Sequence, residues 1–345
     1  MTKYKFDEIA INSTQKKKPT EEDKVYYIGL EHIDPGCFDV VRWGSDVAPT
    51  GDKLLMQKGD VLFGKRRAYQ RKVAIAPFDG IFSAHGMVLR PNLKVIDANY
   101  FPFFISSDKF METAVRMSVG GLSPTINWKD LARQEFELPS LDEQKVLADK
   151  LWAAYRLKEA YKKLLVATDE MVKSQFIEMF GGLCQDTSWS DVVTITNGKA
   201  YPEEYQEEGA YPICGSGGIM CYGEKKLCNG NTTILGRKGN INNPIFMESG
   251  YWIVDTAFSI DVDKAKLHPK FFYYWCCQYD FTMLNKQGVL PSLTRKDLEK
   301  VKMAIPQMRD QLKFVSIAEQ ADKSKFELRK SIDAIDKVIR SLING

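Results

Sequence analysis

The sequence has few histidines and no clustered cysteines. The three histidines are His32, His85 and His268, and they lie far apart in the chain. Seven cysteines occur, but no two of them form a Cys-x-x-Cys pair. Zinc sites need Cys or His ligands at short spacings, and hydrolytic triads need a histidine beside a nucleophile. The sequence therefore predicts neither a metal site nor catalytic residues in this chain.

Long apolar runs and a strong net charge are also missing. No apolar run reaches the roughly 18 residues of a membrane span, so we expect none. The first residues lack the apolar segment of a signal peptide, which predicts a cytoplasmic protein. The formal net charge is +3, from 48 basic and 45 acidic side chains. Net charge alone does not predict binding to nucleic acid, so any such surface must be local.

The sequence does contain a long internal repeat. The segment that begins at Gly121 returns at Gly288, 167 positions later (288 − 121). A repeat of this length is too long for a solenoid unit, so it predicts two copies of one globular module. At this constant offset, identical residues recur without a gap at Gly121/Gly288, Pro124/Pro291, Lys129/Lys296, Asp130/Asp297, Leu131/Leu298, Pro139/Pro306 and Gln144/Gln311.

Each copy continues into a long amphipathic helix. Ser140 and Glu143 form a capping-box pattern at the start of the first helix. Apolar residues spaced alternately four and three apart predict the seam of a coiled coil, and Lys158 and Lys325 share one seam position. The alternative is that each helix packs only on a globular core. The predicted seam consists of Leu147, Leu151, Tyr161, Leu165, Val172, Phe314, Leu328, Ile332, Ile335, Ile339 and Leu342.

The parts of the chain before each helix are rich in short predicted strands, such as 61–63, 73–76 and 87–89. We predict an α+β fold with two tandem α/β domains, each followed by a long helix. The two helices are expected to pair as an antiparallel coiled coil with pseudo-two-fold symmetry. The predicted segments are a first domain (1–140), a first helix (141–182), a second domain (183–306) and a second helix (307–345).

Three short motifs resemble cofactor sites but lack a required feature. Gly59–Lys65 fits a phosphate-binding loop, but Arg66 stands where Ser or Thr should hold magnesium, and a strand is predicted next instead of a helix. Cys214–Gly218 is glycine-rich. Asn243–Phe246 resembles the Asn-Pro-Pro-aromatic motif of amino-methyltransferases, with Ile245 in place of the second proline. We interpret the last two as turns and predict no cofactor in this chain.

One loop in each copy is a candidate for contact with double-stranded DNA. Each loop follows a strand that ends in glycine, and Arg, Lys, Asn and Gln suit phosphates and base edges. The alternative is a solvated surface loop, which is our interpretation of Lys16–Lys18. The loop has the same place in both copies, whereas its residues differ. The candidate residues are Lys65, Arg66, Arg67, Tyr69, Gln70, Arg71 and Lys72 in the first copy, and Arg237, Lys238, Asn240, Asn242 and Asn243 in the second.

In this order, the features resemble the specificity subunit of a type I restriction–modification enzyme. The resemblance covers essentially the full length, because domain and long helix alternate twice. The segments that carry it are Leu138–Gln144 before the first helix, Ile305–Gln307 before the second, the strand-Gly-basic segments at Gly64 and Gly236, and Tyr211–Gly218.

The resemblance implies a non-catalytic subunit with two target-recognition domains. Each domain would recognise one half of a split, asymmetric DNA target, and the paired helices would set the distance between the halves. Two modification subunits, which carry S-adenosylmethionine and methylate adenine, would dock on the helices. Restriction subunits that use ATP and Mg²⁺ would join them.

Three other functions stay open from the residues alone. A stand-alone DNA-binding regulator would need tight binding without partners, and near-neutral domains do not favour that. A coiled-coil scaffold that never contacts DNA would not need the basic loops. An enzyme with degenerate motifs would bind S-adenosylmethionine or cleave DNA by itself. The half-site sequences and their spacing are not predicted.

Overall fold

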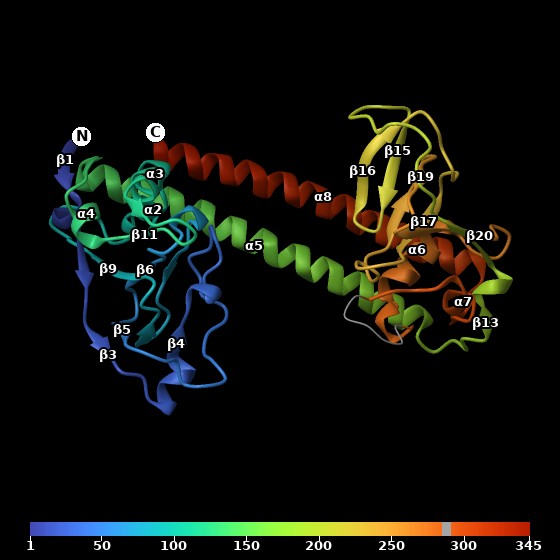
Figure 1. Cartoon of the computed structure of the whole chain (residues 1–345), viewed down its shortest axis with the longest axis horizontal. Coiled ribbons are helices and arrows are strands. Elements are labelled where there is room, and N and C mark those ends of the chain that lie inside the picture. Colours follow the sequence, from blue (N-terminus) through green and yellow to red (C-terminus); the bar gives the residue numbers. More distant parts are fainter. Residues whose placement is uncertain (285–290) are drawn as a thin grey trace. The chain divides into compact units, whose positions relative to one another are not determined.

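The computed structural model describes residues 1–284 and 291–345 (Figure 1). Gly288, the first residue of the second repeat copy, lies outside the described residues. The chain divides into two compact units: unit 1 comprises Met1–Lys162 and Arg329–Gly345, and unit 2 comprises Lys163–Leu328. Each unit thus contains one globular domain and a part of both long helices.

The two long helices are α5 (Leu141–Phe180) and α8 (Met308–Asn344). The predicted capping box is confirmed at the start of α5. Ser140 N donates to Glu143 Oε2 at 2.9 Å, and Glu143 N donates to Ser140 Oγ at 3.4 Å. Neither helix is long and apolar enough to cross a membrane, and the same holds for every other helix of the described residues.

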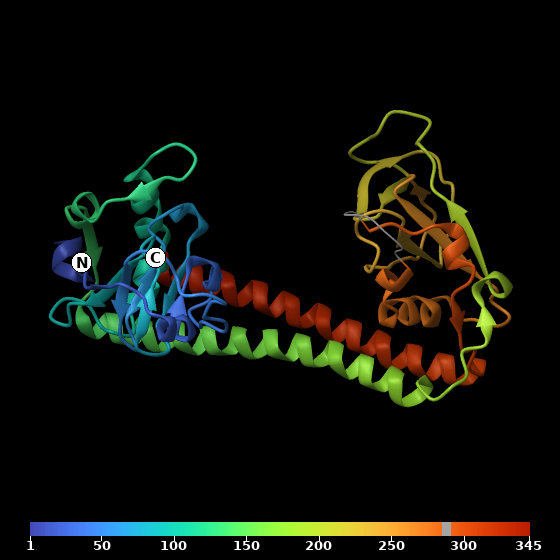
Figure 2. The same ribbon diagram turned by 60° about the horizontal axis from the view of Figure 1, so that its bottom comes forward.

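Within each unit, the segments of α5 and α8 run side by side (Figures 1 and 2). In unit 1, Leu151 near the start of α5 shares a core with Ile339 near the end of α8. In unit 2, Val172 and Phe176 of α5 share a core with Phe314 near the start of α8. Because the start of one helix meets the end of the other in both units, the helices are antiparallel, as predicted.

The remaining predicted seam residues are placed as follows. Leu147, Ile335 and Leu342 pack against the core of unit 1. The residues in the middle of the helices are half-buried, and their pairing stays a prediction: Tyr161, Leu165, Leu328 and Ile332.

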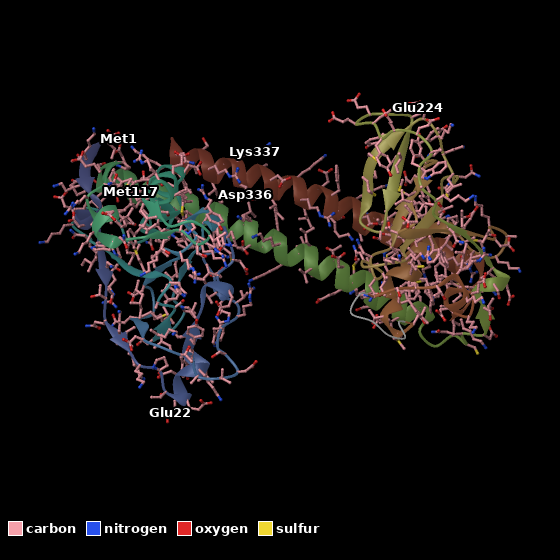
Figure 3. All side chains as sticks on the ribbon, viewed as in Figure 1. Met1, Glu22, Met117, Glu224, Asp336 and Lys337 are labelled. Carbon is pink, nitrogen blue, oxygen red and sulfur yellow. The ribbon has the colours of Figure 1, made fainter. Side chains whose placement is uncertain are left out.

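An ion pair between the helices occurs in each unit, with the roles of the helices exchanged. In unit 1, Lys158 Nζ of α5 lies 2.7 Å from Asp336 Oδ1 of α8, and Asp336 is labelled in Figure 3. In unit 2, Lys325 Nζ of α8 lies 2.7 Å from Asp169 Oδ1 of α5. Both residues shift by the repeat offset (325 − 158 = 336 − 169 = 167), so the two units use equivalent contacts.

Unit 1 contains two four-stranded sheets and two short strand pairs. Its strands are β1 (Thr2–Lys5), β2 (Ala10–Ser13), β3 (Lys16–Lys17), β4 (Tyr27–Ile28), β5 (Lys53–Met56), β6 (Val61–Phe63), β7 (Val73–Ile75), β8 (Gly80–Phe82), β9 (Met87–Pro91), β10 (Ser118–Val119), β11 (Thr125–Ile126) and β12 (Glu135–Leu138). Its short helices are α1 (Phe6–Ile9), α2 (Phe101–Ser106), α3 (Asp108–Arg116), α4 (Trp128–Ala132) and the 3₁₀ helices η1 (Glu21–Tyr26), η2 (Leu30–His32) and η3 (Ala68–Gln70). Lys16–Lys17 therefore form a strand, so our interpretation of this segment as a loop is wrong.

The described residues of unit 2 repeat this plan with fewer strands. Its strands are β13 (Thr187–Ser188), β14 (Val193–Asn197), β15 (Tyr211–Gly215), β16 (Gly218–Gly223), β17 (Thr232–Gly236), β18 (Ile245–Met247), β19 (Trp252–Ile253), β20 (Ala257–Val262) and β21 (Lys302–Met303). Its short helices are α6 (Pro269–Gln278), α7 (Arg295–Leu298) and the 3₁₀ helices η4 (Trp189–Asp191) and η5 (Phe281–Leu284).

The sheet topology is shared by both units. The antiparallel sheet β2-β9-β6-β7 of unit 1 corresponds to β14-β20-β17-β18 of unit 2. The parallel pair β4–β8 corresponds to the parallel pair β15–β19, and β1–β12 corresponds to β13–β21. The predicted α+β class and the tandem domains are confirmed.

A buried glutamine fixes each long helix to its domain. The Gln144 side chain is fully buried; its Oε1 accepts from Asp97 N at 2.8 Å, and its Nε2 donates to Val95 O and Pro139 O. Gln311 is also fully buried and makes the same three kinds of bond: its Oε1 accepts from His268 N, and its Nε2 donates to Lys266 O and Pro306 O. The repeated glutamine is therefore a structural residue.

Candidate DNA interface

The basic loop of unit 1, residues 65–72, connects β6 to β7 and contains η3. Arg67 and Arg71 flank η3 with φ angles of 56° and 53°, which non-glycine residues adopt rarely. The loop is fixed to β11 and the residue before it: Arg67 N donates to Pro124 O at 2.8 Å, and Ile126 N donates to Lys65 O at 3.1 Å. These bonds hold the loop in one conformation at the edge of the domain.

Unit 2 fixes its own loop with the same contacts. Gly239 N donates to Pro291 O at 2.9 Å, and Leu293 N donates to Arg237 O at 2.9 Å. An antiparallel bridge joins Lys238 to Ser292, as Arg66 is joined to Thr125 in unit 1. The structure thus joins each basic loop to the repeated proline and the two residues after it, 124–126 in unit 1 and 291–293 in unit 2. The sequence alone did not connect these features. We call this joined arrangement the loop clamp.

The unit 1 loop presents positive charge to solvent. Arg67 and Tyr69 are exposed, and the Arg67 guanidinium bonds Ser123 Oγ at 3.0 Å. Lys65, Arg66 and Gln70 are partly exposed. Partial burial, and then the nearby charge of Lys16, lower the pKa of Lys65. These residues form one basic surface.

The same surface includes residues that the sequence analysis missed. His85 Nε2 lies 3.3 Å from the Arg66 guanidinium. Loss of solvent contact lowers the pKa of His85, and the charges of Arg66, Lys65 and Lys53 lower it further. Strand β3 pairs with β5, which brings Lys16 and Lys53 to one sheet. No local pattern predicts that pairing. The unit 1 basic cluster consists of Lys16, Lys53, Lys65, Arg66, Arg67 and His85.

Two predicted contact residues of unit 1, the exposed Arg71 and the half-buried Lys72, bond other parts of the same domain. Arg71 donates to Ser106 O at 2.9 Å and to Asp108 Oδ1 at 2.6 Å. Lys72 Nζ donates to Leu30 O at 2.6 Å. These bonds hold the loop against α2, α3 and η2 in the unbound chain, and the contact of both side chains with DNA stays a prediction.

The unit 2 loop has different side chains. Arg237, Lys238, Asn240 and Asn243 are exposed, and the Arg237 guanidinium lies 6.0 Å from the centre of the Phe258 ring. Asn242 is engaged internally, because its amide donates to Asp280 Oδ1 at 2.8 Å and accepts from Phe281 N at 2.7 Å. Unit 2 therefore offers two amides and two cations where unit 1 offers mainly cations.

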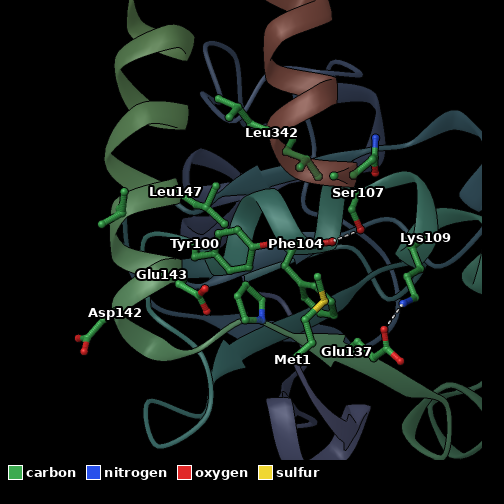
Figure 4. A pocket seen from close by; sticks show the side chains of 15 residues that line it. Met1, Tyr100, Phe104, Ser107, Lys109, Glu137, Asp142, Glu143, Leu147 and Leu342 are labelled. Carbon is green, nitrogen blue, oxygen red and sulfur yellow. Dashed lines mark hydrogen bonds and ion pairs between the residues drawn. The ribbon is translucent and has the colours of Figure 1, made fainter.

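A groove of about 760 Å³ lies in unit 1 where the ends of α5 and α8 meet the domain (Figure 4). Its apolar wall includes Tyr100, Phe104 and Leu147. Its charged residues have structural partners. Glu143 caps α5, and the bonds from Ser140 lower the pKa of the Glu143 carboxyl, while Lys109 lies 3.8 Å from Glu137. The groove is thus the joint between the domain and the helices.

The three motifs that resemble cofactor sites lie in strands and in the connections next to them. Gly59–Lys65 contains β6 and leads through the basic loop into β7, not into a helix. In Cys214–Gly218, only Ser216 and Gly217 form a turn, between β15 and β16, so the interpretation as a turn is wrong for Cys214, Gly215 and Gly218. Asn243–Phe246 enters β18, so its interpretation as a turn is wrong for Ile245 and Phe246. Among the described residues, no group of three His, Cys, Asp or Glu side chains is placed to hold a metal ion.

Comparison with known proteins gave matches over most of the chain. The family model described as "Type I restriction modification DNA specificity domain" matches residues 3–165 and 185–335. The type I restriction enzyme EcoDI specificity subunit of Escherichia coli is 26% identical over 142 residues. This match covers 41% of the chain and only 31% of that relative's length.

Two solved structures share the fold. The S subunit of the type I restriction-modification system from M. genitalium gives a TM-score of 0.63 at 16% identity, over 99% of this chain and 94% of that one. A structure described as "Structural basis underlying complex assembly and conformational transition of the type I R-M system" gives a TM-score of 0.60 at 15% identity, over 99% of this chain and 96% of that one.

Proposed function

The chain belongs to the family of type I restriction modification DNA specificity domains, and on that premise we propose that it is the specificity subunit of a type I restriction–modification complex. Each of its two target-recognition domains binds one half of a bipartite, asymmetric DNA target. The chain itself performs no chemistry, and it directs adenine methylation or cleavage by partner subunits.

The loop clamp is the observation that carries this proposal. Both units hold a basic loop with the same backbone bonds, so the two loops have equivalent positions in their domains. The side chains that they present to solvent differ: exposed Arg67 and Tyr69 with partly exposed Arg66 in unit 1, and exposed Lys238, Asn240 and Asn243 in unit 2. Equivalent supports with different side chains suit the recognition of two unlike half-sites, because side chains at base edges determine sequence choice.

The long helices are the proposed docking site for two modification subunits, which supply S-adenosylmethionine. Restriction subunits that use ATP and Mg²⁺ complete the nuclease. The helix surface supports docking, because Leu157, Leu164 and Met171 recur every seven residues on α5 and are each exposed by 45% or more. An exposed apolar row of this kind is typical of a surface that a partner helix covers.

A pair of loop variants tests the recognition surface. K65A/R66A/R67A removes exposed cations of the unit 1 basic cluster, and we expect it to abolish or relax recognition of one half-site only. R71A/K72A removes two internally bonded cations, and we expect it to lower stability with the same sequence preference. Modified-base sequencing of cells that carry each variant measures the outcome. An unchanged motif in the first variant would remove these residues from the interface.

A further inference from the structure

In unit 1, the segment around Phe38 fills the space between the edge strand β7, α2 and α5. Phe38 is only 6% exposed, and its ring lies 4.9 Å from the Phe103 ring and 5.7 Å from the Trp152 ring. Ile75 N on the edge strand β7 donates to Phe38 O at 2.9 Å. Tyr155 Oη of α5 accepts from Phe38 N at 2.9 Å. An extended segment therefore fills this site by backbone bonds and one inserted side chain.

In unit 2, the equivalent site is an open groove of about 580 Å³. The connection from β15 to β17 takes residues 216–231, whereas that from β4 to β6 takes residues 29–60 and includes the Phe38 segment. The shorter connection has no stretch that reaches the groove. The residues that line this groove are equivalent to those that surround Phe38 in unit 1. Phe246 corresponds to Ile75 and Tyr274 to Phe103, both at an offset of 171 residues. On the long helices, Glu319 corresponds to Trp152 and Asp322 to Tyr155, both at an offset of 167.

The groove keeps the bonding groups that hold the segment in unit 1. Strand β18 is an edge strand of its sheet, like β7. Phe246 pairs with Thr233 as Ile75 pairs with Val61, so its N–H faces the open side. Asp322 stands where Tyr155 Oη accepts two backbone N–H groups in unit 1. Its carboxylate also accepts from Tyr274 Oη at 2.5 Å and lies 2.8 Å from Lys325 Nζ, so the added segment shares this acceptor with them. Exposed strand edges and acceptors of this kind bind an added extended segment.

The side-chain position in the groove differs from that in unit 1. Carboxylates of Glu319 and Asp322 replace the rings of Trp152 and Tyr155, whereas Tyr274 keeps an aromatic wall. The Lys270 ammonium already lies between a carboxylate and a ring of this groove: its Nζ is 2.7 Å from Glu319 Oε1 and 5.6 Å from the centre of the Phe246 ring. A basic side chain suits such a mixture of carboxylate and aromatic groups. A guanidinium can stack on an aromatic ring and donate hydrogen bonds to a carboxylate at the same time.

We propose that the unit 2 groove binds an extended segment of a modification subunit, with an arginine or lysine at the place that Phe38 occupies in unit 1. The segment's carbonyl accepts from Phe246 N, and its successive N–H groups donate to Asp322. The identity of the partner rests on the proposed function and on α8 forming one wall of the groove. The pose and the preference for a basic side chain rest only on the two units.

Binding of peptides to the full chain, without partner subunits, tests how the segment binds and whether the groove prefers a basic side chain. The first peptide is the Ile33–Val41 sequence with Cys37→Ser, and the second carries Phe38→Arg in addition. We expect the arginine peptide to bind at least about 10-fold more tightly, measured by titration calorimetry or NMR. No saturable binding of the arginine peptide at millimolar concentration, or a preference for the phenylalanine peptide, would overturn the proposal.

A variant of the chain provides the reverse test. E319W/D322Y gives the unit 2 groove the walls of unit 1, and we expect it to prefer the phenylalanine peptide. A variant that folds, as judged by circular dichroism, and keeps the arginine preference counts against the assigned walls. Where the double variant does not fold, E319Q alone serves, with an expected loss of preference of several-fold.

Photo-crosslinking tests the partner. A benzophenone side chain replaces Lys323, an exposed residue that lines the groove, in the complex with the modification subunit. We expect a cross-link to an extended segment that contains arginine or lysine. The matched control is Arg156 in unit 1 (323 − 167), where the site is filled, and no such cross-link is expected there. A cross-link only to a helix would overturn the proposal, whereas failure of the two chains to associate would count against the proposed function.

Discussion

Gln144 and Gln311 show why a polar residue recurs at a buried position. Each side chain satisfies one N–H and two carbonyl groups that the ends of neighbouring elements leave without partners. A buried polar group without a partner costs more free energy than an average hydrogen bond contributes. The repeat predicted that both positions matter, but it did not indicate whether their role is structural or functional.

Replacing either glutamine by leucine should therefore destabilise the unit that contains it. Q144L and Q311L leave three backbone groups unbonded, and we expect a loss of about 2–4 kcal/mol in the free energy of unfolding. Urea denaturation measures the loss. Q320A, at an exposed glutamine of α8, is the control and should change stability by less than about 0.5 kcal/mol. Equal effects of all three variants would contradict the structural role.

The three histidines predict a pH-dependent stability. Loss of solvent contact is the main cause that lowers the pKa of His32, His85 and His268. The folded chain then binds fewer protons than the unfolded chain, so the free energy of unfolding falls as the pH drops below about 6.5, the unfolded pKa. We expect lower stability at pH 5.5 than at pH 8 in urea denaturation. H32Q/H268Q should reduce that difference, and an unreduced difference would assign it to other groups.

Single residues also show where sequence patterns stop being informative. The run from Lys65 to Lys72 predicts a basic loop correctly, yet Arg71 and Lys72 bond Ser106, Asp108 and Leu30, which lie far away in the sequence. Charge type predicts that a side chain can contact a phosphate, but its direction depends on the φ angles of the loop and on the neighbouring elements. Lys53 and His85 were missed for the same reason.

At the scale of elements, the long helices were the most predictable part of the chain. The apolar spacing of both helices and the capping box of α5 are local patterns, and the bounds of α5 and α8 follow the predicted ones closely. The Phe38 segment and the pairing of β3 with β5 depend on contacts between distant residues. These contacts have no period that a sequence can show, which is why the open groove of unit 2 was not predicted.

The two inter-helix ion pairs should differ in their contribution to stability. The Lys158 side chain is 9% exposed, and Asp336 is its one carboxylate partner among the described residues, whereas Lys325 bonds both Asp169 and Asp322. D336N leaves a nearly buried ammonium without a carboxylate, and we expect a cost of about 1–3 kcal/mol. D169N should cost less than about 1 kcal/mol. Denaturation of both variants measures this order, and the reverse order would contradict the assignment.

At the scale of the whole molecule, the repeat, the paired helices and the loop clamp support one account. Two domains of the same plan present different side chains on equivalent supports, and an equivalent ion pair joins the two helices within each unit. A stand-alone regulator or a scaffold would not need two different loops on equal supports. The account therefore requires DNA methylation in the cell to depend on this chain.

Modified-base sequencing of the source genome, with the gene intact and deleted, tests that requirement most directly. We expect an adenine-methylated, split and asymmetric motif that is present with the gene and absent without it, and its two halves would be the two half-sites. A methylation pattern that is identical with and without an expressed gene would contradict the account and favour a regulator or a scaffold.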